Sequence, residues 1–242
     1  MNQTSGYELT IIVPLFNESE NLVRLEKELS EFQQTALLKS CILFVNDGSN
    51  DDSLILIKNI CKNNQGFYYL SFEQNCGLSA ALKAGFDFTH SPYVGYIDAD
   101  LQTTPADFNK LIPYLNDYGL VTGIREDRKD SLIKKQSSKI ANKFRRRITH
   151  DGVEDTGCPL KIMKTDIAKQ MPFFKGMHRF IPALVLLQNE KIKQVPIRHF
   201  PRLAGTAKYN LRNRMISPFI DCFAFKWMAK RYIRYQVIEQ KI

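Results

Sequence analysis

The chain has 242 residues, of which 44% are hydrophobic, 11% aromatic and 24% charged. This length and composition fit one globular domain with a sizeable core, and they exclude a disordered chain, a collagen-like repeat and a disulfide scaffold. The formal net charge of +9 favours an anionic partner, which could be nucleic acid, a phosphorylated small molecule or an anionic membrane surface. A basic protein without such a partner stays an alternative.

The N-terminal half alternates short apolar runs with helical patterns. Runs rich in β-branched and aromatic residues predict strands at residues 9–13, 41–45, 67–72 and 93–97. Apolar residues at helical spacing predict helices between them, over residues 22–29, 54–60 and 78–88. This alternation predicts an α/β fold whose mainly parallel sheet is flanked by helices on both faces.

Polar clusters lie at the carboxyl ends of three of these predicted strands. They are Asn17-Glu18, Asn46-Asp47 and Asp98-Ala99-Asp100. In parallel α/β sheets, ligands bind beyond the carboxyl ends of the strands. The sequence therefore predicts one site at one edge of the sheet, built from these three clusters.

The C-terminal half is more basic and less regular. Residues 119–124 predict a strand, and the stretch 125–147 that follows holds ten Lys or Arg residues against three acidic ones. Residues 151–163 are typical of a loop that enters a strand, and residues 191–200 predict another strand. From residue 212 to residue 235, basic residues mix with aromatic ones.

Asp98 and Asp100 are two carboxylates whose spacing lets both reach one cation. Oxygen ligands of this kind suit Mg²⁺ or Mn²⁺. A metal there would neutralise the charge that develops on a leaving diphosphate when a nucleotide-sugar is cleaved. A D-x-D sequence alone is common in surface loops, but this one follows an apolar strand and continues into Leu101-Gln102-Thr103.

Several segments in chain order resemble the N-terminal half of a family 2 glycosyltransferase: IIVPLFNESENL, ILFVNDGSNDDS, CGLSAALKAGF and YIDADLQTTP. The later segments GIR, DTGCPLKIMK and PRLAGTAKYN are similar to the dolichyl- and polyprenyl-phosphate sugar transferase group, which includes dolichyl-phosphate mannose synthase. The resemblance covers roughly residues 8–235. It implies a GT-A fold and an inverting transfer of a sugar from a UDP- or GDP-sugar to undecaprenyl or dolichyl phosphate.

The resemblance also implies which residues bind the nucleotide-sugar. They are Pro14, Phe16, Glu18, Asn46, Asp47, Asp98, Ala99, Arg125, Arg202 and Lys208. Pro14, Phe16 and Glu18 would line the nucleoside pocket, and Asn46 and Asp47 would contact the base or the ribose. Asn46 departs from the family pattern, which usually has a second aspartate there. An amide both donates and accepts, so a base contact survives while the identity of the base stays open.

The implied metal site consists of Asp98, Asp100 and Gln102, which would hold Mg²⁺ or Mn²⁺. Asp100 is also expected to be catalytic, together with Asp155. A polyprenyl monophosphate is already a nucleophilic anion, because its second pKa is about 6. Asp155 would therefore act either as a base or as a group that orients the acceptor. A structural role, as a loop carboxylate paired with a nearby arginine, stays open beside these two.

The implied phosphate contacts come from Arg125, Arg202 and Lys208. Arginine pairs phosphate oxygens bidentately and lysine acts as a compact charge, so the mixture suits a diphosphate and a lipid phosphate together. The segment GMHRF resembles an acceptor-side segment of the bacterial relatives, which makes His178 and Arg179 further candidates for the lipid phosphate. A structural histidine with protein partners stays the alternative for His178. The loop 73–77 lacks the cation that many relatives carry there, so we expect no direct phosphate contact from it.

The domain organisation expected from the sequence is a catalytic domain over residues 1–210 and an amphipathic basic segment over residues 211–242. Many members of the group continue into two transmembrane helices, whereas the apolar stretches of the given sequence, such as residues 183–187, are far shorter than the ~18 residues needed to span a bilayer. The segment 211–242 could lie in an anionic membrane interface or pack on the domain's own core. Without a signal peptide or C-x-x-C pairs, the chain is expected to be cytoplasmic, peripheral on the cytoplasmic face of a membrane.

Two kinds of alternative remain at this point. A family 2 glycosyltransferase could instead act on a soluble glycan or another cell-envelope acceptor. A nucleic-acid-binding module would need phosphate-tracking cations and stacking aromatics on one surface, and no such motif occurs. The sugar, the base, the polyprenyl length and the oligomeric state stay open.

Overall fold

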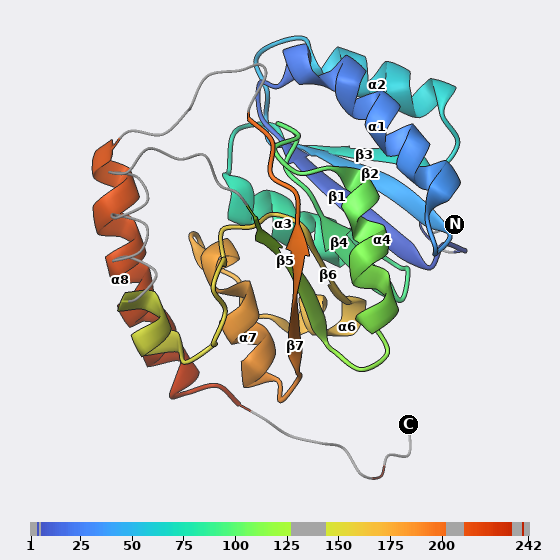
Figure 1. Cartoon of the computed structure of the whole chain (residues 1–242). Helices are drawn as coiled ribbons and strands as arrows, with labels where there is room; N and C mark the ends of the chain where they lie inside the picture. Colours follow the sequence, from blue (N-terminus) through green and yellow to red (C-terminus); the bar gives the residue numbers. More distant parts are fainter. Residues whose placement is uncertain (1–3, 5, 127–143, 202–210, 234–238, 240–242) are drawn as a thin grey trace.

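The computed structural model describes residues 4, 6–126, 144–201, 211–233 and 239, and for residues 211–218 it describes the backbone alone. These residues fold around a seven-stranded sheet (Figure 1). Its strands are β1 (Leu9–Leu15), β2 (Ser40–Asn46), β3 (Phe67–Ser71), β4 (Tyr93–Tyr96), β5 (Leu120–Arg125), β6 (Lys161–Lys164) and β7 (Ile192–Ile197). They lie in the order β3-β2-β1-β4-β6-β5-β7.

The sheet is mainly parallel, as the alternating pattern predicts. Strands β1, β2, β3 and β4 pair in parallel, and β5 pairs in parallel with β7. The exception is β6, which lies between β4 and β5 and is antiparallel to both. The loop and strand predicted over residues 151–163 thus correspond to a loop that leads into β6, a short strand that is antiparallel to its neighbours.

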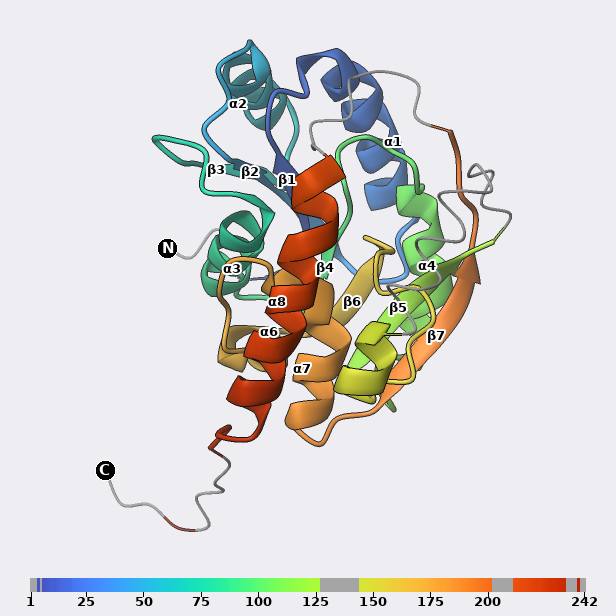
Figure 2. The same ribbon diagram turned by 90° about the vertical axis from the view of Figure 1, so that its left-hand side faces the viewer.

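Helices cover both faces of the sheet, as Figures 1 and 2 show. One face carries α1 (Leu22–Thr35), α2 (Ser53–Asn63) and α4 (Phe108–Leu111), and the other carries α3 (Leu78–Phe88), α6 (Thr165–Gln170), α7 (Ile181–Leu187) and α8 (Leu211–Ala229). Short 3₁₀ turns occur at η1 (Ser19–Asn21), η2 (Pro105–Asp107), η3 (Ile112–Tyr114) and η4 (Met177–Phe180), and residues 144–149 are helical.

Alternate side chains of the central strands pack into two separate hydrophobic cores, one on each face of the sheet. Ile11 and Val13 of β1 belong to the core under α1, α2 and α4, whereas Ile12 belongs to the core under α3, α6 and α7. This is the two-residue period of a strand that is buried on both faces. The helix α3 comes very close, because a Cβ atom at Gly85 would lie 2.6 Å from Cδ1 of Ile12.

Helix α8 packs on the second core through one of its faces. Cys222 and Phe225 are each 3% exposed and belong to that core, and the ring of Phe225 stacks on Phe180 with centroids 5.3 Å apart. Among the described residues, no helix has the length and apolar character needed to cross a bilayer.

Candidate active site

The carboxyl ends of β1, β2 and β4 lie at one edge of the sheet. Leu15 and Asn46, the last residues of β1 and β2, pair directly. The N–H of Ile97 donates to the carbonyl of Ile12 at 3.1 Å, so the chain leaves β4 for Asp98 beside the end of β1. The structure therefore brings the three predicted polar clusters to one edge.

Hydrogen bonds join the loop after β1 to the turn after β2. The N–H of Asn17 donates to Oγ of Ser49 at 2.9 Å, and Oδ1 of Asn17 accepts from the N–H of Asn50 at 2.8 Å. The N–H of Glu18 donates to Oγ of Ser53 at 3.0 Å. Asn17 adopts a left-handed φ of 51°, which asparagine tolerates better than most residues. The two loops thus form one bonded unit.

The predicted nucleoside-lining residues sit on this unit. Pro14 is buried in β1 opposite Val45, and Phe16 and Glu18 are half-buried in the loop. Oε2 of Glu18 accepts from Nδ2 of Asn21 at 2.6 Å, which fixes the glutamate at the start of η1. A nucleoside contact by these residues stays a prediction.

Asn46 and Asp47 are buried, being 1% and 4% exposed. Nδ2 of Asn46 donates to Oγ of Ser71 at 3.0 Å, and its Oδ1 accepts from the N–H of Ser49 at 3.3 Å. Asn46, where the family usually has an aspartate, therefore uses its amide N–H to bind the hydroxyl of Ser71 on the neighbouring strand β3.

Asp47 holds the loop that begins α3, a role that sequence reasoning missed. Its Oδ1 accepts from the N–H of Cys76 at 2.7 Å, and its Oδ2 accepts from the N–H of Gly77 at 2.8 Å and from Nδ2 of Asn75 at 2.9 Å. Burial raises the pKa of Asp47, and the bonds from Cys76 and Gly77 oppose that rise. The signal available in the sequence is Gly77 before Leu78, a helix start without a capping side chain of its own.

The turn after β4 carries the predicted metal ligands Asp98, Asp100 and Gln102. Leu101 has a φ of 49°, which is uncommon for a residue other than glycine. Ala99 and Leu101 are 4% and 1% exposed and belong to the core under α1 and α4. Since strained backbone persists only where its surroundings hold it, the buried Leu101 fixes the turn that carries the two carboxylates.

The chemistry of this turn fits a divalent cation. Asp98 is half-buried and Asp100 is 8% exposed, and Oδ1 of Asp100 accepts from the N–H of Gln102 at 3.2 Å. In the described part of the chain, no three His, Cys, Asp or Glu side chains are arranged to hold a metal. Two carboxylates with an amide oxygen leave room for phosphate oxygens and water, the ligand set that Mg²⁺ takes in phosphate chemistry.

Arg125 and Asp155 form a bidentate ion pair at the end of β5. Nε of Arg125 donates to Oδ2 at 2.7 Å and NH2 donates to Oδ1 at 2.8 Å. The side chains are 12% and 10% exposed. Burial alone would lower the pKa of Arg125, but the bond to Asp155 and its charge outweigh burial and raise it. Gly157 provides the space, because a Cβ there would lie 3.2 Å from NH2 of Arg125.

Lys161 lies wholly buried below this pair, and the sequence patterns did not single it out. Its Nζ donates to the carbonyls of Thr156 (3.2 Å) and Cys158, and Oη of Tyr96 lies 3.4 Å away. In the sheet, Lys161 pairs with Tyr96, the last residue of β4. Burial lowers the pKa of Lys161. The lysine thus ties the turn that follows Asp155 to the strand that precedes Asp98.

His178 and Arg179, the further phosphate candidates, have protein partners. Nδ1 of His178 lies 2.8 Å from Oγ of Ser79, which also accepts from the N–H of Gly176 at 3.1 Å. NH1 of Arg179 donates to Oδ2 of Asp221 on α8 at 3.2 Å. Burial, and then the charges of Arg179 and Lys161, lowers the pKa of His178 to about 3.

The end of β7 is bonded to the turn that carries the carboxylates. The N–H of Phe200 donates to the carbonyl of Gln102 at 2.9 Å, and the N–H of Arg198 donates to Oδ2 of Asp107 at 3.1 Å. Arg202 and Lys208 lie outside the described residues, so their predicted phosphate contacts stay predictions.

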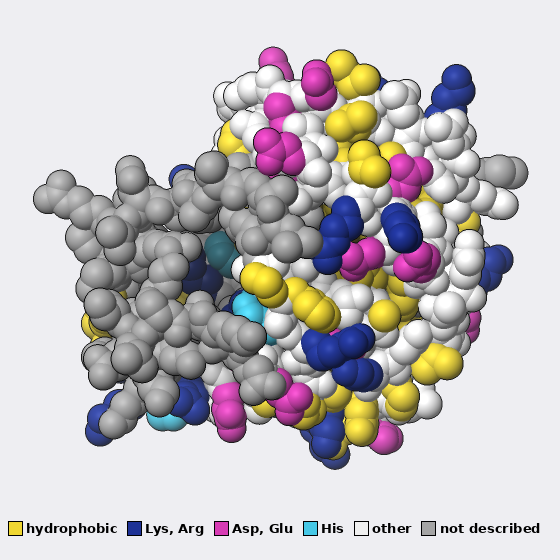
Figure 3. Space-filling model, turned by 45° about the horizontal axis from the view of Figure 1, so that its top comes forward, with side chains coloured by type: hydrophobic (Ala, Val, Ile, Leu, Met, Phe, Trp, Pro, Cys, Tyr) yellow, Lys and Arg dark blue, Asp and Glu magenta, His cyan; other side chains and the backbone are white. Residues whose placement is uncertain are grey.

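Figure 3 views the molecule with the α1 and α2 end brought forward. On the described part of this face, Lys and Arg side chains lie beside Asp and Glu side chains and form no continuous basic stripe. A surface that tracks a nucleic-acid backbone needs such a stripe. The described part of this face therefore gives the nucleic-acid alternative no support.

Curated proteins with similar sequences transfer sugars, by their names. A dodecaprenyl-phosphate galacturonate synthase of Rhizobium johnstonii is 31% identical over 84% of this chain and 62% of its own length. An undecaprenyl-phosphate 4-deoxy-4-formamido-L-arabinose transferase of Salmonella choleraesuis is 28% identical over 88% of this chain and 66% of its own length. The chain thus spans less than two thirds of either relative.

Solved structures of similar fold are glycosyltransferases of the GT-A class. A glucosyl-3-phosphoglycerate synthase of Mycobacterium tuberculosis, in complex with Mn²⁺, UDP and glucosyl-3-phosphoglycerate, has a TM-score of 0.67 at 14% identity, over 94% of this chain and 81% of that chain. A mannosyltransferase of Pyrobaculum calidifontis, in complex with GDP-mannose and Mn²⁺, has a TM-score of 0.68 at 14% identity, over 97% of this chain and 67% of that chain. The predicted GT-A fold is confirmed.

The family assignment rests on a direct match as well. Residues 10–172 match the model of glycosyl transferase family 2, a segment that holds β1 to β6 and the turn with Asp98 and Asp100. The resemblance carried by the short sequence segments is therefore confirmed over most of the fold, and the chain belongs to glycosyl transferase family 2.

Proposed function

We propose that the chain transfers a sugar, with inversion, from a UDP- or GDP-sugar to a polyprenyl phosphate. The observation that carries this proposal is the fixed turn with Asp98 and Asp100, placed beside the bonded loops of β1 and β2 at the carboxyl edge. Both curated relatives are named for products or substrates of the polyprenyl-phosphate type, and the solved neighbours bind UDP or GDP-mannose.

In this proposal Asp98, Asp100 and Gln102 hold Mg²⁺ or Mn²⁺, the ions present in the solved neighbours. The cation would neutralise charge on the departing diphosphate. The buried Leu101 keeps the carboxylates in place before substrate arrives, so little reorganisation is needed at the reaction.

The nucleoside would lie against the unit formed by the first two loops. Pro14, Phe16 and Glu18 line it from β1, and Asn46 bounds it from β2. Ala99 is buried beneath the turn and gives the floor of the site a small side chain. Because Asp47 is committed to the loop at the start of α3, its role at the nucleotide is to shape that loop.

The acceptor phosphate would meet Arg125, Arg202 and Lys208. Two N–H groups of Arg125 bind Asp155, and a guanidinium has five, so donors remain for a phosphate oxygen. A phosphate monoester is mostly deprotonated at neutral pH and needs no strong base. The pairing of Asp155 with Arg125 therefore favours the orienting role for Asp155 over the role of a base.

Because the proposed acceptor is a lipid, the transfer reaction would take place at a membrane surface. We propose that the chain is peripheral on the cytoplasmic face, with residues 1–210 as the catalytic domain and residues 211–242 as the segment that meets the lipid. The basic net charge of +9 supports contact with an anionic leaflet.

Thermal melting with and without Mn²⁺ tests the donor site. One class among UDP-, GDP- and dTDP-sugars should raise the melting temperature by about 5–10 °C at a hundredfold excess over its Kd, and only with Mn²⁺. Asp98→Asn and Asp100→Asn should abolish that rise. Asp117→Asn, an exposed aspartate before β5, is the matched control and should keep it. Metal-dependent stabilisation that survives in both site variants would refute the metal assignment.

Transfer of labelled sugar tests the acceptor. Label should become extractable into organic solvent only when undecaprenyl phosphate is present. Label that moves instead to a water-soluble glycan, or to another envelope acceptor without undecaprenyl phosphate, would replace the proposed acceptor by the alternative within the same family.

A further inference from the structure

The two faces of α8 differ in what they contact. Cys222 and Phe225 are buried on the second core, whereas four large apolar side chains point away from it. These four form what we call the α8 stripe: Phe219 is 37% exposed, Ile220 62%, Phe223 60% and Trp227 62%. Residues 219, 223 and 227 are one helical turn apart, so the stripe is continuous along the helix. Apolar surface gathered in this way marks an interaction site.

The helix that carries the stripe is held firmly to the domain. Phe225 stacks on Phe180, and Asp221 is bonded to Arg179 of η4. Phe144 of the helical residues 144–149 contacts Phe219, with ring centroids 4.6 Å apart. Figure 2 shows α8 lying across the front of this side of the molecule, over α6 and α7. The stripe is therefore displayed by an anchored outer helix.

Within residues 219–233, the exposed charged residues beside the stripe are basic. Lys226, Lys230 and Arg231 are exposed on α8 and just beyond it, and the guanidinium of Arg231 lies 4.7 Å from the ring centre of Trp227. Between residues 219 and 233 the one acidic residue is Asp221, which is 9% exposed and paired with Arg179. Exposed aromatic and aliphatic groups flanked by Lys and Arg are the composition of a helix that lies in an anionic membrane interface.

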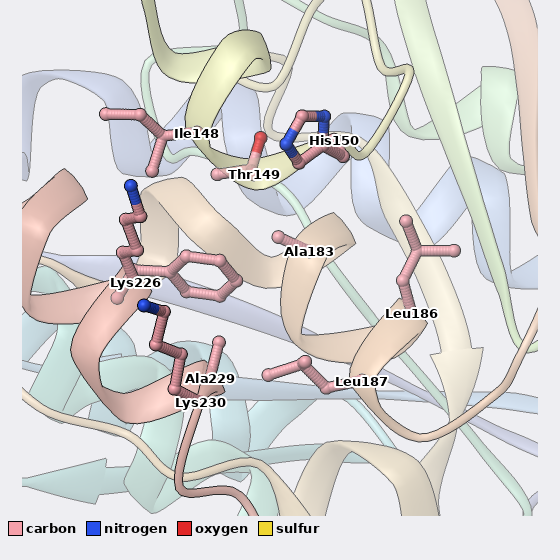
Figure 4. A pocket seen from close by; sticks show the side chains of 10 residues that line it. Ile148, Thr149, His150, Ala183, Leu186, Leu187, Lys226, Ala229 and Lys230 are labelled. Atoms are coloured by element: carbon pink, nitrogen blue, oxygen red, sulfur yellow. The ribbon is translucent and has the colours of Figure 1, made fainter.

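A groove runs along the lysine side of the stripe. It has a volume of about 350 Å³ and lies between residues 148–150, α7 and α8. Its walls include Leu186, Leu187 and Phe225, and Figure 4 shows Lys226 and Lys230 along one side of it. An apolar groove with ammonium groups beside it suits the hydrocarbon chain of a lipid whose head group is anionic.

We propose that the α8 stripe docks the protein on an anionic phospholipid bilayer, with Phe223 and Trp227 at the boundary between head groups and acyl chains. The lysines Lys226 and Lys230 bind head-group phosphates, and the groove beside them receives part of one acyl chain. A protein partner would need exposed acids to match the cations, whereas an anionic leaflet supplies the charge over the whole surface. This inference deepens the proposed function. It rests on that function only for the biological role of docking, which is to bring the active site to a lipid acceptor.

The chain contains its own reporter, because Trp227 is its one tryptophan. We expect a blue shift of the intrinsic emission, and quenching by brominated acyl chains, on mixing the full chain with vesicles of phosphatidylcholine and phosphatidylglycerol. Vesicles of phosphatidylcholine alone should give a much weaker response. Neither vesicle contains polyprenyl phosphate and no nucleotide-sugar is added, so the result is independent of catalysis.

Variants distinguish binding through the stripe from nonspecific adsorption to vesicles. The double change Lys226→Gln and Lys230→Gln should weaken co-sedimentation with anionic vesicles about thirtyfold. Phe223→Ser should also weaken co-sedimentation. Ile55→Ser on α2 is the control and should not weaken it, because the native Ile55 side chain is 61% exposed and lies outside the stripe. All these side chains are exposed, so the melting temperature should stay unchanged.

Three results would overturn the proposal. The first is the absence of an emission shift with anionic vesicles, and the second is an equal loss of vesicle binding in Phe223→Ser and Ile55→Ser. The third is a dimer in solution that Phe223→Ser dissociates, which would make the stripe a contact between two copies. If the protein fails to bind vesicles but still transfers sugar, the docking proposal is refuted and the proposed function stands. If it binds vesicles but transfers no sugar, only the proposed function is refuted.

Discussion

His178 illustrates how the environment of one residue decides its chemistry. The family resemblance of the segment GMHRF makes His178 a candidate for a phosphate contact, with a structural histidine as the alternative. In the structure its Nδ1 faces the hydroxyl of Ser79, and burial lowers its pKa to about 3. A histidine with this pKa is neutral at pH 7 and carries no positive charge to offer a phosphate. Its contact with Ser79, at the start of α3, ties η4 to that helix and favours the structural role.

This shift predicts how stability depends on pH. The folded pKa of about 3 lies below the ordinary value of 6.5, so between these values the unfolded chain binds more protons than the folded chain. The contribution of His178 is therefore complete above pH 6.5 and is lost as the pH falls toward 3. From pH 7 to pH 5, the free energy of unfolding should drop by at most about 2 kcal/mol more in the native chain than in His178→Gln.

Urea denaturation at the two pH values measures this difference. Carboxylates titrate in the same range, but they are common to both chains and cancel in the comparison. His90→Gln, at an exposed histidine, should behave like the native chain. Parallel pH dependences in the native chain and in His178→Gln would show that the buried imidazole does not titrate as argued.

At the scale of the elements, the approach to β6 is the part that the sequence predicted least well. A loop entering a strand is readable in residues 151–163, but no local pattern says that the strand is reversed or that it lies between β4 and β5. Strand order is set by which cores the side chains share, and such contacts are far apart in sequence. In contrast, β1 and β2 are buried along their whole length, so their apolar runs alone predicted them.

Lys161 was missed for the same reason. A lysine inside the run PLKIM is expected to reach solvent, yet it is wholly buried and its Nζ donates to the carbonyls of Thr156 and Cys158. The convergence of the three polar clusters was readable, because it follows from the parallel direction of β1, β2 and β4. The commitment of Asp47 to the loop before α3 was not readable, because its partner Cys76 lies 29 residues away. For Asp155 a pairing with an arginine was an open alternative, and the structure identifies Arg125, 30 residues away, as the partner.

Lys161→Met should loosen the turn that follows Asp155. The change leaves two buried carbonyls without a donor, and each such group costs about 1–3 kcal/mol. Relief of the buried charge offsets part of that cost, so we expect a net loss of about 2–4 kcal/mol in the free energy of unfolding. The matched control is Lys164→Met on the same strand, whose side chain is 40% exposed and should cost far less. Equal losses in the two variants would mean that the buried bonds of Lys161 contribute nothing beyond its strand position.

At the scale of the whole molecule, the structure bears on how the chain divides. The sequence suggests a catalytic domain over residues 1–210 and an amphipathic basic segment over residues 211–242, which could pack on the domain's own core or meet a membrane. Cys222 and Phe225 of that segment belong to the same core as α3, α6 and α7. The stripe on the other face of α8 is exposed, and we propose that it meets a membrane. A helix that packs on the core with one face and contacts lipid with the other would couple membrane contact to the fold that holds the active site.

This coupling predicts that a chain ending at residue 210 is poorly stable. Removal of α8 uncovers Phe180 and the apolar face of α7, and the loss of a buried phenylalanine alone costs about 3–5 kcal/mol. Since a domain of this kind has a total stability of about 5–15 kcal/mol, the truncated chain should melt far below a chain that ends at residue 233. Phe225→Ala in the full chain should reproduce much of that loss, whereas Phe223→Ala on the exposed face should not. If the chain of residues 1–210 instead melts at the temperature of the full chain, α8 is an appendage and the division at residue 210 is a true domain boundary.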